Sequence, residues 1–229
     1  MNFSEFEKNA GINFADKKLL RQAFVHRSYI NENKDAGFEH NERLEFLGDA
    51  VLELVITDYL YKKYPDKTEG DMTLYRSALV NATTCAAVAT KLGVNDFLIL
   101  SKGESKDVGR ARQYILANTL EAIIGALYLD QGYDVAKDFI GRHISPLIGK
   151  VLAEGSWMDS KSRFQERAQD IEGSTPSYKT IKETGPDHDK RFTVGVFIGA
   201  KMVASGEGES KQDAEQEAAR KALEVKSWE

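Results

Sequence analysis

HNERLEFLGDAVLELVITDYL, residues 40–60, is an apolar helical segment whose first turns carry Glu42, Glu45 and Asp49. These acids are three and four residues apart, and an α-helix turns about 100° per residue, so all three lie on one face. Carboxylates among leucine and valine repel each other and lose hydration unless a positive charge compensates. The pattern therefore favours a hard divalent cation such as Mg²⁺, which takes oxygen ligands.

A second apolar segment, YILANTLEAIIGALYLD at 114–130, places Asn118 and Glu121 on one helical face. Two explanations of Glu121 are open from this pattern. It forms a salt bridge with Arg110 or Arg112, or it shares a metal ion with the acids of the first segment. Helices of one bundle can aim such residues at a common point, which favours the metal.

The bulk composition bounds the class of protein. The chain has 229 residues and a net charge of −5, so any binding of a polyanion must come from local patches. Cys85 is the only cysteine, which fits a reducing compartment such as the cytoplasm and predicts a small core residue. The histidines are scattered without zinc-ligand spacing, and no segment has the length and apolarity of a signal peptide or membrane helix.

The hydrophobic pattern changes at a polar segment, residues 154–160, which we interpret as a linker. Before it, residues 1–153 predict an all-α domain; after it, residues 161–229 predict a small α+β domain of order α-β-β-β-α. The expected helices of the first domain are 19–29, 43–64, 74–92, 114–129 and 133–152, the last interrupted near Pro146, with a polar loop at 101–110. The second domain is expected to contain helices at 161–170 and 210–226 and strands at 177–184, 191–198 and 201–206, in which Phe192, Val194 and Val196 face the core.

The segment NERLEFLGDAVL resembles the signature of bacterial ribonuclease III. Further segments resemble the same family in the expected order: LLRQAFVHRSYINEN, YPDKTEGDMTLYRSALVN, LSKGE and ILANTLEAIIGALYLDQG. The C-terminal part resembles a double-stranded RNA-binding domain in RFQERAQ, GPDHDKRF and GEGESKQDAEQEAARKAL.

The resemblance implies a helical endonuclease domain that forms a homodimer. Two active sites would cut the two strands of an RNA duplex, with Mg²⁺ as cofactor and Mn²⁺ as a possible substitute, leaving 5′-phosphate and 3′-hydroxyl ends. Ribosomal and messenger RNA precursors are the substrates that the family suggests. The matching positions are Asp49 and Glu121 as catalytic residues; Glu45, Asn118, Glu121 and Asp49 around the metal; Glu42 and Glu69 as further acids of the catalytic valley; and Phe46 at the dimer interface.

The resemblance also implies an RNA-binding surface on the second domain. Gln165 and Glu166 match residues that reach one minor groove of A-form RNA, and His188 matches the contact in the next. Lys211 matches a phosphate contact. The family has adjacent basic residues at that helix start, whereas Gln212 follows Lys211 here. We expect weaker and less salt-sensitive binding than the family norm.

Asn118 is the other departure, because the family has aspartate there. Its carbonyl oxygen can still ligate a cation, but one negative charge is lost. The leading hypothesis is an active enzyme with an altered metal demand. The alternative is a catalytically weak double-stranded RNA-binding protein with the same fold.

Overall fold

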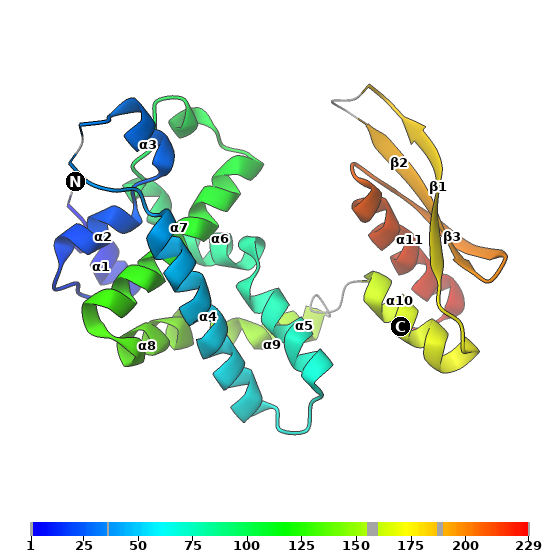
Figure 1. Cartoon of the computed structure of the whole chain (residues 1–229). Coiled ribbons are helices and arrows are strands. Elements are labelled where there is room, and N and C mark those ends of the chain that lie inside the picture. Colours follow the sequence, from blue (N-terminus) through cyan, green and yellow to red (C-terminus); the bar gives the residue numbers. More distant parts are fainter. Residues whose placement is uncertain (1, 36, 155–159, 187–189, 229) are drawn as a thin grey trace. The chain divides into compact units, whose positions relative to one another are not determined.

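The chain forms two units, Met1–Trp157 and Met158–Glu229 (Figure 1). The computed structural model describes residues 2–35, 37–154, 160–186 and 190–228. The expected linker at 154–160 and the loop position of His188 fall largely or wholly outside these described residues.

Unit 1 is built around two long helices, α4 and α7, which pack against each other at its centre (Figure 1). Helices α2, α6 and α8 pack on α7, and α5 packs on α4. The α-helices of the unit are α1 Ser4–Ala10, α2 Lys17–Ala23, α3 Arg27–Glu32, α4 Glu42–Lys63, α5 Glu69–Val80, α6 Ala82–Lys91, α7 Arg110–Gln131, α8 Tyr133–His143 and α9 Ile148–Glu154, and the short 3₁₀ helices are η1 Val94–Phe97, η2 Glu104–Lys106 and η3 Ser145–Leu147.

Two glycines let α4 and α7 approach to backbone contact. A Cβ atom at Gly125 would lie 2.1 Å from the Leu44 carbonyl oxygen, and a Cβ at Gly48 would lie 2.8 Å from the Gly125 nitrogen. Both distances are far below van der Waals contact, so only glycine fits at either position. The crossing therefore fixes which turns of the two helices face each other.

The expected helix at 19–29 is wrong, because the chain leaves the helix after Ala23. Val25 forms a parallel β-bridge with Ile99 instead, and His26 begins α3 by accepting the Ser28 backbone N–H at its ring nitrogen. The buried Asn41 side chain donates to the Ala23 carbonyl oxygen at 3.0 Å and so ties the start of α4 to this break.

The expected helix at 74–92 is also wrong, because it is divided at Asn81. The Asn81 side chain accepts the Thr84 backbone N–H and starts α6 as a new helix. A capping box between Thr68 and Asp71 begins α5 upstream of the expected start. Helix α7 and the break near Pro146 agree with the expectation, and Cys85 is buried in the core as predicted.

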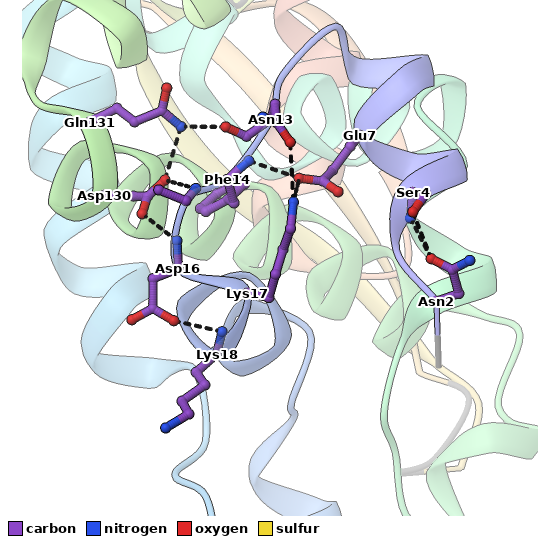
Figure 2. A network of polar contacts seen from close by, with 11 residues as sticks. Asn2, Ser4, Glu7, Asn13, Phe14, Asp16, Lys17, Lys18, Asp130 and Gln131 are labelled. Atoms are coloured by element: carbon purple, nitrogen blue, oxygen red, sulfur yellow. Dashed lines mark hydrogen bonds and ion pairs between the residues drawn. The ribbon is translucent and has the colours of Figure 1, made fainter.

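The N-terminal segment, for which no helix was predicted, is pinned by carboxylates (Figure 2). The buried Glu7 accepts the Phe14 backbone N–H at 2.7 Å and pairs with the Lys17 ammonium at 2.6 Å. At the end of α7, the two Asp130 carboxylate oxygens accept the backbone N–H groups of Ala15 and Asp16, both at 2.8 Å. The N-terminus of α2 is thereby fastened to the C-terminus of α7.

Unit 2 has the predicted α-β-β-β-α order, with an antiparallel sheet in the order β1-β2-β3. Its elements are α10 Ser160–Glu172, β1 Ser177–Thr184, β2 Arg191–Ile198, β3 Lys201–Gly208 and α11 Lys211–Lys226. Val194 and Val196 are buried as predicted, whereas Phe192 is half-buried. Helix α11 faces the sheet with alanines, and a Cβ at Gly206 would lie 2.2 Å from the Ala218 nitrogen.

Candidate functional site

The α4–α7 crossing brings the acids of the two helical segments together. Glu45 and Asp49 flank Gly48 on α4, while Glu121 lies one turn before Gly125 on α7. Glu45 and Glu121 are half-buried, and Asp49 is exposed. Asn118, also half-buried, lies near Glu45, and the interaction of its side chain with that carboxyl lowers the pKa of Glu45. We call Glu45, Asp49, Asn118 and Glu121 the acidic cluster.

The carboxylates of the acidic cluster affect one another electrostatically. Burial, followed by repulsion from Asp49 and Glu45, raises the pKa of Glu121 to about 8. Burial and the nearby charges of Glu42 and Asp49 raise the pKa of Glu45, against the effect of the Asn118 side chain. Burial raises the pKa of the Cys85 thiol to about 12, with smaller contributions from the charges of Glu121 and Asp49. This thiol therefore stays neutral. The site concentrates negative charge.

The salt-bridge explanation of Glu121 does not hold. Arg112 donates instead to the carbonyl oxygens of Asp107, Glu104 and Ser105, at 3.0 to 3.1 Å. Across the ranges that the structure describes, no lysine, arginine or histidine lies within ion-pair distance of an acidic-cluster carboxylate. The negative charge is therefore not compensated by protein cations.

The donor chemistry of the acidic cluster fits a hard cation. Carboxylate and amide oxygens are the ligands of Mg²⁺, which keeps several waters and needs only one or two protein carboxylates. Among the described residues, no group of three His, Cys, Asp or Glu side chains is arranged to hold a metal ion, so the protein donors would be two carboxylates and the Asn118 amide oxygen, with waters as the other ligands. The cluster is an open, uncompensated oxygen site, which suits a metal that retains waters.

Two further predicted acids lie apart from each other. Glu42 is one turn before Glu45 and pairs with the Arg27 guanidinium at 3.1 Å, with His40 at 3.7 Å. Glu69 begins α5 and accepts the Thr73 hydroxyl at 3.0 Å. It follows the far end of α4, and the rise of that helix separates this end from Asp49 by about 20 Å. Within one chain, Glu42 adjoins the acidic cluster and Glu69 does not.

The exposed face of α10 carries the predicted RNA contacts of unit 2. Gln165 and Glu166 are both exposed and line a shallow depression of about 330 Å³. Lys211, at the start of α11, is held by the Glu183 carboxylate at 3.0 Å, and Glu183 also pairs with Lys190 at 3.4 Å. Hydrogen bonds from Lys211 and Lys190 lower the pKa of Glu183.

Comparison with known proteins identifies both units. Residues 16–148 match the family described as Ribonuclease-III-like. The chain belongs to the ribonuclease III family. Residues 160–226 match the double-stranded RNA binding motif, so this ribonuclease III-type endoribonuclease has double-stranded RNA as its binding partner.

Curated relatives support the family across nearly the whole chain. Ribonuclease 3 of Carboxydothermus hydrogenoformans is 46% identical over 224 residues, covering 98% of this chain and 95% of the relative. Ribonuclease 3 of Geobacillus thermodenitrificans is 44% identical over 226 residues, covering 97% of this chain and 90% of the relative.

A solved nuclease domain of ribonuclease III from Campylobacter jejuni is 41% identical, with a TM-score of 0.58, and covers 63% of this chain and 97% of that domain. It is described as flexible in a region involved in dimer formation. Among the described residues of the present ribonuclease III, no helix is long and apolar enough to cross a membrane.

Phe46, the residue matched to the family's dimer interface, is unusually exposed on unit 1. The Phe46 side chain on α4 is 81% exposed, although the rest of that helix buries most of its large apolar residues. Phe46 helps to line a groove of about 630 Å³, together with Leu19, Leu47 and Leu129 and with charged residues that include Glu39 and Arg43. An exposed aromatic ring beside leucines in a groove favours a self-complementary contact.

The sequence did not predict the contact that restrains Lys211, the expected phosphate contact. Glu183 lies in β1 and Lys211 begins α11, so nothing in their spacing signals the pair. A cross-element ion pair of this kind depends on tertiary structure. The sequence showed only that one lysine was available at the helix start.

Proposed function

We propose that this ribonuclease III cleaves both strands of double-stranded RNA by Mg²⁺-dependent hydrolysis, leaving 5′-phosphate and 3′-hydroxyl ends. The observation that carries the proposal is the acidic cluster: three carboxylates and one amide at the α4–α7 crossing, with no ion pair to a protein cation among the described residues. Mn²⁺ is the substitute cation that the same oxygen donors would accept.

The residues of the acidic cluster have distinct proposed roles. Glu45, Glu121 and the Asn118 carbonyl oxygen would hold the cation, which when bound acidifies a water and neutralises charge on phosphate oxygens. The exposed Asp49 completes the cluster and orients the attacking water as a hydrogen-bond acceptor. Water adds to phosphorus, the bond from phosphorus to the 3′ oxygen breaks, and that oxygen takes a proton.

Cutting both strands requires two acidic clusters, and we propose that a homodimer supplies them. The support is the exposed Phe46 ring beside a groove whose lining includes Leu19, Leu47 and Leu129. Each partner would insert its ring into the groove of the other, an isologous arrangement with two-fold symmetry. Glu69, which is distant from the cluster of its own chain, would then belong to the valley that the two subunits form together.

The RNA-binding unit would hold the duplex by shape. We propose that Gln165 and Glu166 enter one minor groove and that Lys211 contacts phosphates across the major groove. His188 is proposed for the second minor groove from the family match alone. We further propose ribosomal and messenger RNA precursors as substrates and the cytoplasm as the site of action.

Cleavage of a long end-labelled RNA duplex tests the proposed reaction. We expect cutting with Mg²⁺, none with chelator, and none in Glu121→Ala, while Glu5→Ala, an exposed acid on α1, cuts normally. Products should be ligatable at 5′-phosphates. Retention of the duplex without cutting at every Mg²⁺ and Mn²⁺ concentration would refute the nuclease proposal.

A second candidate function is a catalytically weak double-stranded RNA-binding protein. The observation that favours it is Asn118, whose side-chain interaction with Glu45 engages one of the carboxylates that would ligate the metal. Titration of Mg²⁺ with the wild type and Asn118→Asp separates the two. An active wild type that needs more Mg²⁺ than Asn118→Asp supports the altered-demand hypothesis, whereas cutting only by Asn118→Asp supports the weak binding protein.

A further inference from the structure

A groove of about 710 Å³ lies between the second half of α4 and helix α8, away from the acidic cluster. Its volume falls within the range of about 300–1,000 Å³ that is common for small-molecule sites. Val55 and Tyr59 contribute apolar and aromatic surface from α4. Gly141 of α8 faces the groove, and a Cβ there would meet nothing within 4 Å. The absence of a side chain at this position keeps the groove open.

The rim of this groove is positively charged on a chain of net charge −5. The Asp58 carboxylate is shared between the Lys62 ammonium at 2.7 Å and the Lys137 ammonium at 3.1 Å. One negative charge thus faces two positive charges. Lys63 adds a third positive charge, and its ammonium donates a hydrogen bond to the Tyr59 hydroxyl oxygen at 2.6 Å.

The remaining charged pair of the lining does not alter this balance. Arg142 is directed to the Gly11 carbonyl oxygen at 3.0 Å, and the Asp138 carboxylate offsets its charge. The lining therefore holds four cations against two acids, a local charge of 4 − 2 = +2. An anion is the ligand that this charge favours.

The lysines can change partners at small cost. Lys62 and Lys137 have side-chain exposures of 66% and 41%, and ion pairs between exposed groups are weak because water screens them. A phosphate group can accept several charge-assisted hydrogen bonds from such ammonium groups. The Tyr59 ring beside them is half-buried, with the Lys63 ammonium 5.0 Å from its centroid. A planar ring can stack on an aromatic side chain of this kind, as bases do at nucleic-acid sites.

We propose that the α4–α8 groove binds a small organic anion that carries a planar ring, of the nucleoside phosphate class. A duplex RNA backbone presents phosphates without an apolar group for Val55 and Tyr59, whereas a nucleotide supplies both parts. The groove is also separate from the acidic cluster and from Phe46 of its own chain. Tyr59 lies about 15 Å along α4 from Asp49 and about 20 Å from Phe46.

Nuclear magnetic resonance and calorimetry on the full chain, in chelator, test this site. Chelator prevents a nucleotide from being captured through a metal at the acidic cluster. The probes are adenosine diphosphate, adenosine and inorganic phosphate. We expect the diphosphate to shift backbone amides of 55–63 and 137–145 and to bind about tenfold tighter than either fragment.

Two matched variants separate the groove from the rest of the surface. Gly141→Met fills the groove, and Gly149→Met places the same side chain on α9, where a Cβ also meets nothing within 4 Å. We expect Gly141→Met to weaken adenosine diphosphate binding about tenfold and Gly149→Met to leave it unchanged. Both should retain duplex cleavage, since neither position belongs to the acidic cluster.

The outcomes are decisive in either direction. Equal affinities of Gly141→Met and Gly149→Met, no binding by the wild type, or amide shifts confined to 160–226 would each overturn the proposal. Lys137→Met gives a second check that does not depend on filling the groove, and it should weaken the diphosphate more than adenosine.

Discussion

Gly48 on α4 lies directly against the backbone of Glu121 on α7: a Cβ atom at position 48 would stand 1.7 Å from the Glu121 carbonyl oxygen. The residue that carries the most perturbed carboxyl of the acidic cluster is thus also the residue that the neighbouring helix touches most closely. The same turn of α7 therefore carries the Glu121 carboxyl and makes the backbone contact with α4. This contact fixes the axial position of Glu121 relative to Glu45 and Asp49.

Gly48→Ala should destabilise unit 1 severely. The added methyl group cannot be accommodated without separating the two central helices, and we expect a loss of about 3 kcal/mol, the upper end of the usual range for overpacking. Urea unfolding monitored by circular dichroism measures the change. Gly149→Ala, where the methyl meets open space, serves as the control and should be neutral or slightly stabilising. Equal midpoints for the two variants would show that the helices are not in backbone contact.

Glu121→Gln should stabilise the metal-free protein while abolishing cleavage. The raised pKa of about 8 means that the folded state favours the protonated carboxyl, so the wild type loses stability as pH rises from the ordinary value of 4.5 through about 8. A glutamine side chain does not ionise, so the variant does not lose stability in this way as pH rises. Thermal unfolding in chelator at about pH 9 should show a higher Tm for the variant, with a smaller difference near pH 5.

Added Mg²⁺ provides the complementary measurement. It should raise the Tm of the wild type, because a cation that binds only the folded state stabilises it. The gain should be much smaller in Glu121→Gln. A gain of equal size in both proteins would place the bound cation somewhere other than the acidic cluster.

Asp130→Asn should loosen the attachment of α2 to α7. The amide has one acceptor oxygen where the carboxylate has two, so one of the backbone N–H groups of Ala15 and Asp16 loses its partner, at a cost of about 1 kcal/mol. Burial alone would raise the pKa of Asp130, but the hydrogen bonds from Asp16, Ala15 and Gln131 outweigh it and lower the pKa.

The stabilisation that the Asp130 carboxylate provides depends on pH. A lowered folded-state pKa means that the stabilisation is present above the ordinary value of 3.8 and disappears as pH falls through the folded-state pKa. The difference between wild type and Asp130→Asn in urea should therefore be full at neutral pH and shrink on acidification. A difference that is independent of pH would contradict the carboxylate's role.

Glu183→Gln should tighten the binding of double-stranded RNA. It releases Lys211 and Lys190 from their shared carboxylate and makes both available to phosphates. We expect about a fivefold gain in affinity and a salt slope steeper by about one. Fluorescence anisotropy at several salt concentrations measures both quantities. Glu224→Gln, far along α11, is the control; a similar gain there would indicate a general charge effect.

Phe46→Glu should convert the proposed dimer to a monomer. A charged side chain would lose hydration against Leu19, Leu47 and Leu129, and the Glu39 and Glu42 carboxylates of the same groove would repel it. Sedimentation velocity should report a mass near 25.6 kDa for the variant and twice that for the wild type. Val225→Glu, at a 66% exposed apolar residue of unit 2, should leave the wild-type mass unchanged.

The helical period identified the elements that carry the site but not where they break. Helices α4 and α7 were predicted within a few residues, because their apolar positions repeat over several turns. The breaks at Ala23 and Asn81 were missed, since the apolar pattern runs through both. They depend on the Val25–Ile99 bridge and the Asn81 cap, which are tertiary and local hydrogen-bonding effects that periodicity does not encode.

The acidic cluster was predictable for a similar reason. Regular helices convert sequence spacing into position, so Glu45, Asp49 and Glu121 could be placed before their contacts were known. The geometry of the crossing was not predictable from spacing, because it depends on which glycines meet. Glu69 shows the limit: family matching grouped it with the other acids, whereas the fold of one chain places it at the opposite end of α4.

Helix α11 lies against β3 at backbone distance, because Gly206 and Ala218 have no long side chain between them. Helix α10 in turn packs on α11. The start of α11 and the exposed face of α10 are therefore held at a fixed separation. If these two surfaces contact RNA as proposed, the fixed separation would favour the groove spacing of A-form over B-form helices.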